Sequence, residues 1–76
     1  MHTPPIHNNI RKLRFHRGEM TQKELADKVG VTRQTIVAIE SAKYAPSLVV
    51  AFRISHAFCS PLEEVFIYSP EADPVK

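Results

Sequence analysis

Polar side chains cluster around the start of a short segment that begins at Thr32, and they suit hydrogen bonding to nucleic-acid bases. The Arg33 guanidinium matches guanine O6 and N7, and the Gln34 amide matches adenine N6 and N7. Ala38 can touch a thymine methyl group or simply permit close approach. Thr32 and Thr35 flank these groups and are also candidate contacts. The candidate contacts in the major groove of duplex DNA are therefore Thr32, Arg33, Gln34, Thr35 and Ala38.

Three further residues are candidate contacts to the phosphate backbone. Gln22 combines an amide donor with the free N–H groups expected in the first turn of a helix. Lys43 and Tyr44 follow the polar segment and can reach the backbone beside the groove. Phosphate contacts position a protein on DNA, whereas base contacts select the sequence. The plain alternative is that all these side chains are solvated surface.

An outward position for these side chains requires the segment to be a helix. On a helical wheel Ile36, Ile39 and the stem of Glu40 share one side, and Gln34 and Ala38 share the other. The whole chain indicates five short helices, at about residues 9–17, 21–29, 33–41, 48–58 and 61–66. The start signals are Thr21 with Glu24, then Thr32, Ser47, and Ser60 before Pro61. Gly18 and Gly30 follow predicted helix ends.

The predicted core is an apolar stripe on each helix. The inward positions are Ile10, Leu13, Leu25, Ala26, Val29, Ile36, Ile39, Leu48, Ala51, Phe52, Ser55 and Phe58. Phe66 falls on the side of Leu62 and Val65, and the stretch that it begins can continue as a brief strand. Ile67 and Tyr68 are a candidate dimer contact, since a small monomer has little core to hide them.

The composition fits one small globular domain. The chain has 76 residues and a net charge of +2, with eight basic and four acidic residues from Asn8 to Tyr44. A domain of this size builds one core without a deep substrate cleft, which disfavours most enzymes. We expect a flexible arm at residues 1–7, a folded domain at 8–68 and a tail at 69–76. No membrane-spanning run or signal peptide is visible, and one cysteine fits the reducing cytoplasm.

Other chemistries find no support in the residue pattern. His2, His7, His16 and His56 have no partners at metal-ligand spacing, and no catalytic triad or glycine-rich phosphate loop is visible. We therefore expect no metal, cofactor, small-molecule substrate or catalytic residue. Cys59 is expected to be a small buried residue, with a redox switch or an inter-subunit disulfide as the alternatives.

Three stretches, Gln22–Ala26, Val29–Ile36 and Ile39–Glu40, resemble the Cro and phage-repressor helix-turn-helix family of the XRE type, especially short single-domain bacterial regulators. The likeness spans about residues 8–68. It implies an all-α, five-helix lambda-repressor-like domain that binds operator DNA as a two-fold homodimer. It also implies that Arg14 pairs with Glu40, and that Gln22 contacts phosphate. It implies that Arg33, Gln34 and Ala38 face the bases, and that Lys43 and Tyr44 lie near the DNA backbone.

Two positions depart from that family's pattern. Ala42 and Cys59 stand where the family commonly has glycine. Alanine in a left-handed helix cap costs about 1 kcal/mol more than glycine.

The expected function is a sequence-specific transcriptional regulator, with repression at a near-palindromic operator favoured over activation. The alternative is a protein-interaction module such as an antitoxin or an adaptor. A small RNA-binding protein ranks last, because the chain lacks the aromatic platform on which such proteins stack bases.

Overall fold

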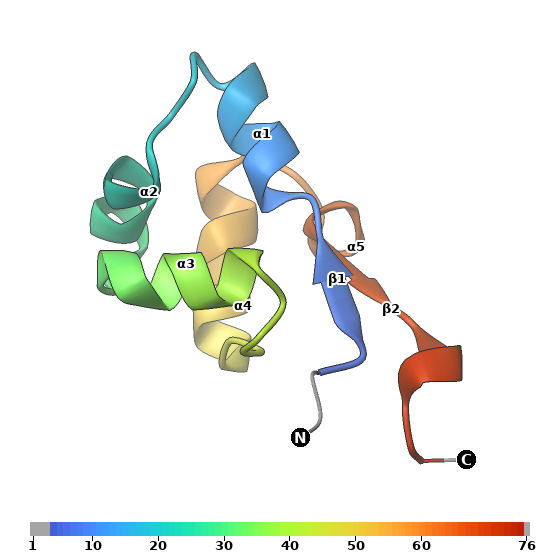
Figure 1. The fold of residues 1–76 in the computed structure, drawn as a ribbon. Helices are drawn as coiled ribbons and strands as arrows, with labels where there is room; N and C mark the ends of the chain where they lie inside the picture. Colours follow the sequence, from blue (N-terminus) through green and yellow to red (C-terminus); the bar gives the residue numbers. More distant parts are fainter. Residues whose placement is uncertain (1–3, 76) are drawn as a thin grey trace.

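The computed structural model describes residues 4–75, which form five α-helices and a small two-stranded sheet (Figure 1). The helices are α1 (Ile10–His16), α2 (Gln22–Val29), α3 (Arg33–Glu40), α4 (Leu48–Ala57) and α5 (Leu62–Val65). Strands β1 (Ile6–Asn8) and β2 (Phe66–Tyr68) pair antiparallel, and a 3-10 turn (Pro70–Ala72) follows them. The five-helix prediction is therefore confirmed, with the two-stranded sheet as an addition.

Side-chain caps fix the starts of three helices as predicted. The hydroxyls of Thr21, Thr32 and Ser47 each accept the N–H of the residue three positions later. The predicted cap at Ser60 is wrong, because Pro61 occupies the cap position and α5 begins at Leu62. The Ser60 hydroxyl instead donates to the carbonyl of Phe58 at 3.1 Å.

The core forms where α1, α2, α3, α4 and α5 meet. Its largest fully buried side chains are Phe58, Ile10, Leu25, Ile36, Ile39, Ile54, Val29 and Val65. Leu48 and Phe52 were predicted to face this core, and that prediction is wrong, because they are 68% and 53% exposed. The inward face of α4 is instead formed by Ala51, Ile54 and Ser55, and Phe58 follows as the helix's C-cap.

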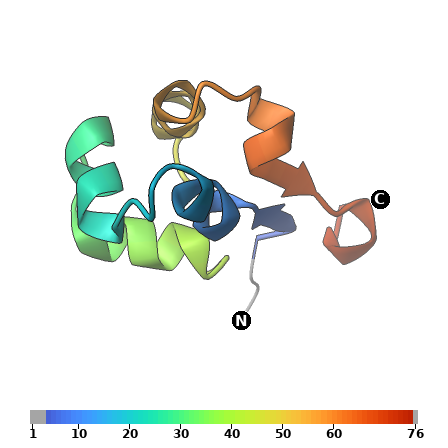
Figure 2. The ribbon, with the colours of Figure 1, turned by 90° about the horizontal axis from the view of Figure 1, so that it is seen from above.

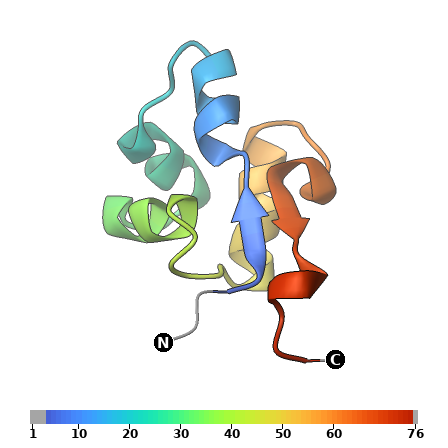
Figure 3. The same ribbon diagram turned by 45° about the vertical axis from the view of Figure 1, so that its right-hand side comes forward.

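The sheet brings two distant parts of the chain together (Figure 3). Ile6 lies opposite Tyr68 and Asn8 lies opposite Phe66, while the Ser69 N–H donates to the Pro5 carbonyl at 2.8 Å. Residues 6 and 7, expected in a flexible arm, thus belong to a strand. Residues 1–3 of the expected arm and residue 76 of the expected tail lie outside the described part of the chain.

Two non-glycine residues adopt the left-handed conformation where glycine was expected. Ala42, just after α3, has φ 62°, and Cys59, after α4, has φ 51°. Cys59 is exposed, so the expectation of a buried cysteine is wrong. Ala42 has the same backbone conformation and is half-buried, so the exposure of Cys59 reflects its place in the fold.

Candidate nucleic-acid interface

Helices α2 and α3 form a tight pair joined by residues 30–32. Gly30 ends α2 in the left-handed conformation, with φ 76°, and the N–H groups of Gly30 and Val31 both donate to the Ala26 carbonyl. Ala26 is 1% exposed, and its small side chain lets α3 cross α2 closely. This arrangement is a helix-turn-helix, in which the first helix braces the second against DNA.

The outer side of α3 carries the predicted base contacts. Arg33 and Gln34 are exposed, and Thr35 and Ala38 are half-buried. Thr32 caps the helix by accepting the Thr35 N–H, and the two threonine hydroxyls lie 2.9 Å apart. The guanidinium and amide groups are thus held on a rigid helix and open to solvent.

A hollow of about 790 Å³ opens between α1, α2 and α3 beside these residues. Gln22 and Arg33 line it, whereas Gln34 and Ala38 lie farther around α3. The charged residues of its wall are Arg11, Arg14, Glu19, Lys23, Arg33 and Glu40. Because Glu40 is neutralised by Arg14, the hollow has a net positive charge that suits an anionic backbone.

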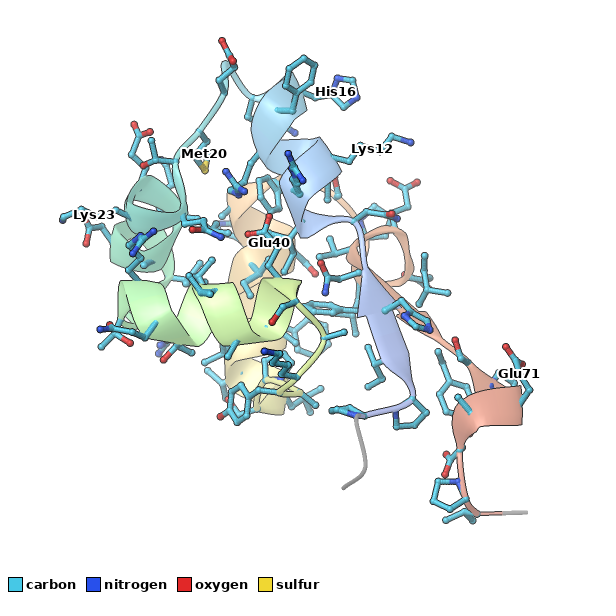
Figure 4. The ribbon with its side chains drawn as sticks, in the orientation of Figure 1. Lys12, His16, Met20, Lys23, Glu40 and Glu71 are labelled. Atoms are coloured by element: carbon cyan, nitrogen blue, oxygen red, sulfur yellow. The ribbon has the colours of Figure 1, made fainter. Side chains whose placement is uncertain are left out.

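Glu40 is the centre of a hydrogen-bond network that connects three helices (Figure 4). Its Oε1 atom accepts from Arg14 Nη2 at 2.6 Å, so the ion pair implied by the family resemblance is present. Its Oε2 atom accepts from Gln22 Nε2 at 2.7 Å. Arg14 also donates to the Met20 carbonyl at 2.8 Å. One carboxylate thus fixes the direction of the Gln22 side chain, whose second N–H is left for another acceptor.

The N-terminus of α2 opens onto the same hollow. Thr21 and Glu24 form a capping box, with hydrogen bonds of 3.0 Å and 2.8 Å. The Thr21 backbone N–H, followed by its hydroxyl, holds the pKa of the exposed Glu24 carboxyl below its ordinary value. The first-turn N–H groups of residues 22 and 23 have no partner among residues 4–75, so they can bind an anion.

Sequence reasoning missed several residues of the hollow, and three of them bear on DNA binding. Arg11 and Lys23 were treated as ordinary surface cations, and only the folded structure shows which cations share a wall. Val37 is 38% exposed and lies on the outer side of α3, as the helical wheel could have shown. Lys12 and His16, by contrast, extend from the side of α1 away from α2 (Figure 4).

Lys43 and Tyr44 follow α3 on the turn toward α4. Both are exposed, and the Lys43 N–H donates to the Ala38 carbonyl at 3.1 Å. The left-handed Ala42 sets the direction in which this turn leaves the helix. The structure therefore places both exposed residues just after the C-terminal end of α3.

The part of the chain that the structure describes shows no group of three or more metal-ligating side chains. None of its helices is long and apolar enough to cross a bilayer.

Comparison with known proteins identifies the class. Residues 10–65 match a family model described as Helix-turn-helix, which covers most of the chain. The chain therefore belongs to this helix-turn-helix family, as the resemblance in the sequence indicated, and it carries the DNA-binding motif that defines the family.

Several relatives align along nearly their whole length. An uncharacterized HTH-type transcriptional regulator of Methanocaldococcus jannaschii is 48% identical over 62 residues, 79% of this chain and 94% of that protein. Another, of Archaeoglobus fulgidus, is 47% identical over 66 residues, 87% of this chain and 93% of that protein. The regulator YgzD of Bacillus subtilis is 46% identical over 59 residues, 78% and 88% of the two chains. The relatives are thus archaeal as well as bacterial, and they are named as regulators rather than enzymes.

Proposed function

We propose that this protein is a transcriptional repressor that inserts α3 into the major groove of a near-palindromic operator. The observation that carries the proposal is the outer side of α3, where Arg33 and Gln34 are exposed beside a positively charged hollow. The relatives named as transcriptional regulators support a role in gene control. Repression follows most simply, because a small domain on an operator blocks access by polymerase.

Within this proposal, base recognition belongs to α3. Arg33 pairs with a guanine and Gln34 with an adenine, each through two hydrogen bonds. Ala38 and Val37 contact thymine methyl groups, since both present small apolar side chains on the outer surface.

Backbone contacts belong to the residues around α3. The N-terminus of α2 and Gln22 hold one phosphate, and Arg11 and Lys23 neutralise its neighbours along the hollow. Lys43 and Tyr44 contact the backbone beyond the other end of α3. These contacts set the orientation of α3 without selecting the sequence.

The repressor acts as a homodimer in this proposal. Ile67 and Tyr68 of β2 are 44% and 57% exposed, and each offers apolar surface to a second copy. A two-fold dimer places its two α3 helices about 34 Å apart, one turn of DNA, which requires a near-palindromic site.

Selection of random duplexes on the purified protein, followed by Arg33→Ala, tests the assignment of bases. We expect Arg33→Ala to weaken the selected site by about 1–3 kcal/mol and to relax the preference at one base pair. Gln22→Ala is the matched variant, and it should weaken all duplexes about equally. An unchanged ranking of operator variants in Arg33→Ala would remove Arg33 from the base contacts.

The salt dependence of binding separates this function from a purely protein-binding module. A domain that touches 6–10 phosphates loses about 10³–10⁵-fold in affinity between 50 and 200 mM salt. A protein-binding module such as an antitoxin or adaptor would show no specific duplex binding at either salt concentration. The exposed apolar residues of α4, Leu48, Val49 and Phe52, are a separate observation that favours protein binding.

A further inference from the structure

Three apolar side chains near the start of α4 are exposed together. Leu48, Val49 and Phe52 are 68%, 59% and 53% exposed, and their spacing places them on the side of α4 that faces away from the core. Seen from above, α4 and α3 lie on opposite sides of the molecule (Figure 2). Val49 and Phe52 line a different hollow from the one proposed to bind DNA, and the two hollows share no lining residue.

The apolar face continues into a groove with a basic rim. Val49, Phe52 and Ala57 line a hollow of about 630 Å³ between α4 and the C-terminal end of α2. The other lining residues are Lys28, Arg53 and His56. Among the described residues, no aspartate or glutamate lines this groove.

The positive charge of the rim is not cancelled locally. Neither Lys28 nor Arg53 forms an ion pair within residues 4–75. Arg53 Nη1 donates weakly to the Val29 carbonyl at 3.4 Å, which holds the guanidinium at the rim and leaves its charge in place. Lys28 lowers the pKa of Glu24 only through space, as the smallest of the causes acting on that carboxyl.

We infer that this groove is a docking site for an acidic amphipathic helix of a partner protein. The occupant carries apolar side chains one turn apart, which cover Val49 and Phe52, and carboxylates on both flanks, which pair with the rim. Charge complementarity of this kind speeds encounter and excludes unsuitable partners. The proposal is independent of DNA binding, because the groove shares no lining residue with the hollow proposed to bind DNA.

Three other occupants fit this groove less well. A second copy docked on the same face by two-fold symmetry would bring two basic rims, each with Lys28 and Arg53, against one another. The acidic C-terminal stretch of this chain is anchored beside β2, where Tyr68 Oη donates to Asp73 Oδ2 at 2.7 Å. Duplex DNA would neutralise the rim but would leave Phe52 without an apolar partner.

A pair of synthetic helical peptides tests the inference. The acidic peptide carries leucines one turn apart on one face and glutamates on both sides of it, and its control replaces every glutamate with lysine. Fluorescence anisotropy should show micromolar binding of the acidic peptide, weakened by salt, and much weaker binding of the lysine peptide.

Matched variants locate the site. Phe52→Ala should weaken binding of the acidic peptide by about tenfold or more. Phe15→Ala is the control, because Phe15 is another exposed phenylalanine, on α1, and does not line this groove. The double variant Lys28→Glu with Arg53→Glu should reverse the preference between the two peptides, so that it binds the lysine peptide more tightly than the acidic one. Operator binding by Phe52→Ala should stay unchanged, which separates this site from the proposed DNA function.

Four outcomes would overturn the inference. The first is equal binding of the two peptides or binding of neither, and the second is equal loss in Phe52→Ala and Phe15→Ala. The third is a loss of duplex affinity in the charge-reversed variant as large as that of Arg33→Ala, which would assign the rim to DNA. The fourth is a change of oligomeric state in Phe52→Ala, which would assign the face to a second copy.

Discussion

Ala42 and Cys59 each hold a backbone conformation that glycine adopts at lower cost, with φ 62° and 51°. Each ends a helix, and the sequence indicated the cost at both positions because glycine is the usual residue there. The conformation was predictable from the local pattern, since helix ends are decided by neighbouring residues. The exposure of Cys59 was not, because it depends on where the rest of the chain packs.

Ala42→Gly should stabilise the protein by about 1 kcal/mol, because it removes the left-handed strain after α3. Urea denaturation measures the change. Ala45→Gly is the matched control, since Ala45 is in the same turn and is not among the positive-φ residues. It should destabilise by about 0.4–1 kcal/mol through the entropy of the unfolded chain. Equal effects of the two changes would refute the strain argument.

Glu40→Gln should destabilise the protein by about 2–4 kcal/mol, because it leaves the Arg14 guanidinium, whose side chain is only 16% exposed, without its counter-charge. Denaturation with urea again gives the value. The control is Asp27→Asn in the exposed pair with Lys23, which should change stability by less than about 1 kcal/mol. Similar losses of stability in both variants would show that the Glu40 network stabilises the protein no more than an ordinary surface ion pair does.

At the scale of elements, local sequence signals predicted the helices. They did not predict the rotation of α4 or the pairing of β1, because both depend on long-range packing. A local capping pattern predicted a helix start at each of Thr21, Thr32 and Ser47, and all three residues cap helices. The rotation of α4 was mispredicted because apolar residues occupy several of its sides, so periodicity alone did not choose between Phe52 and Ile54. Strand β1 pairs with β2, which is distant in the sequence, and no local pattern predicts that pairing.

One of the hydrogen bonds in the segment after β2 can be followed by titration. The Tyr68 phenol donates to Asp73, which raises the pKa of Tyr68, and the same bond, followed by the Val75 N–H, lowers the pKa of Asp73. The contribution of Asp73 to stability is therefore present above the pKa of the unfolded carboxyl. It is lost as the pH falls through the lowered pKa. The contribution of Tyr68 is present at neutral pH and is lost as the pH rises through the raised pKa.

Asp73→Asn should bring the pKa of Tyr68 back toward its ordinary value, as measured by a phenol titration with NMR detection. Glu71→Gln is the control, since Glu71 is the smallest of the charges and bonds that act on this phenol. It should move the pKa of Tyr68 much less. If Asp73→Asn leaves the titration unchanged, the hydrogen bond does not persist in solution.

At the scale of the whole molecule, charge is divided between two halves of the chain. The stretch from Asn8 to Tyr44 has a net charge of +4, and that from Ala45 to Lys76 has −2. This division of charge and the residues of α3 could both be predicted from the sequence alone. The walls of the hollow could not be predicted, because Arg11, Lys23 and Val37 meet there only after α1, α2 and α3 have packed.

Ile67→Glu should convert the proposed dimer to monomers, because the carboxylate cannot be buried without a partner in an apolar contact. Sedimentation equilibrium measures the mass. Affinity for a full operator should fall more than affinity for a half-site. Val75→Glu is the control, since Val75 is an apolar residue exposed in the C-terminal stretch. A dimer that survives Ile67→Glu would show that another surface joins the subunits.

The bond between Ser69 and Pro5 means that the folded chain is nearly a closed loop. A short linker that joins residue 5 to residue 69, in place of the residues beyond them, would cost little entropy, because these two residues lie side by side. New ends could then be cut at the exposed Gly18–Glu19 bend between α1 and α2. Such a circularly permuted chain should keep every helix contact, and a tether to a second protein could leave from the wall of the proposed DNA hollow.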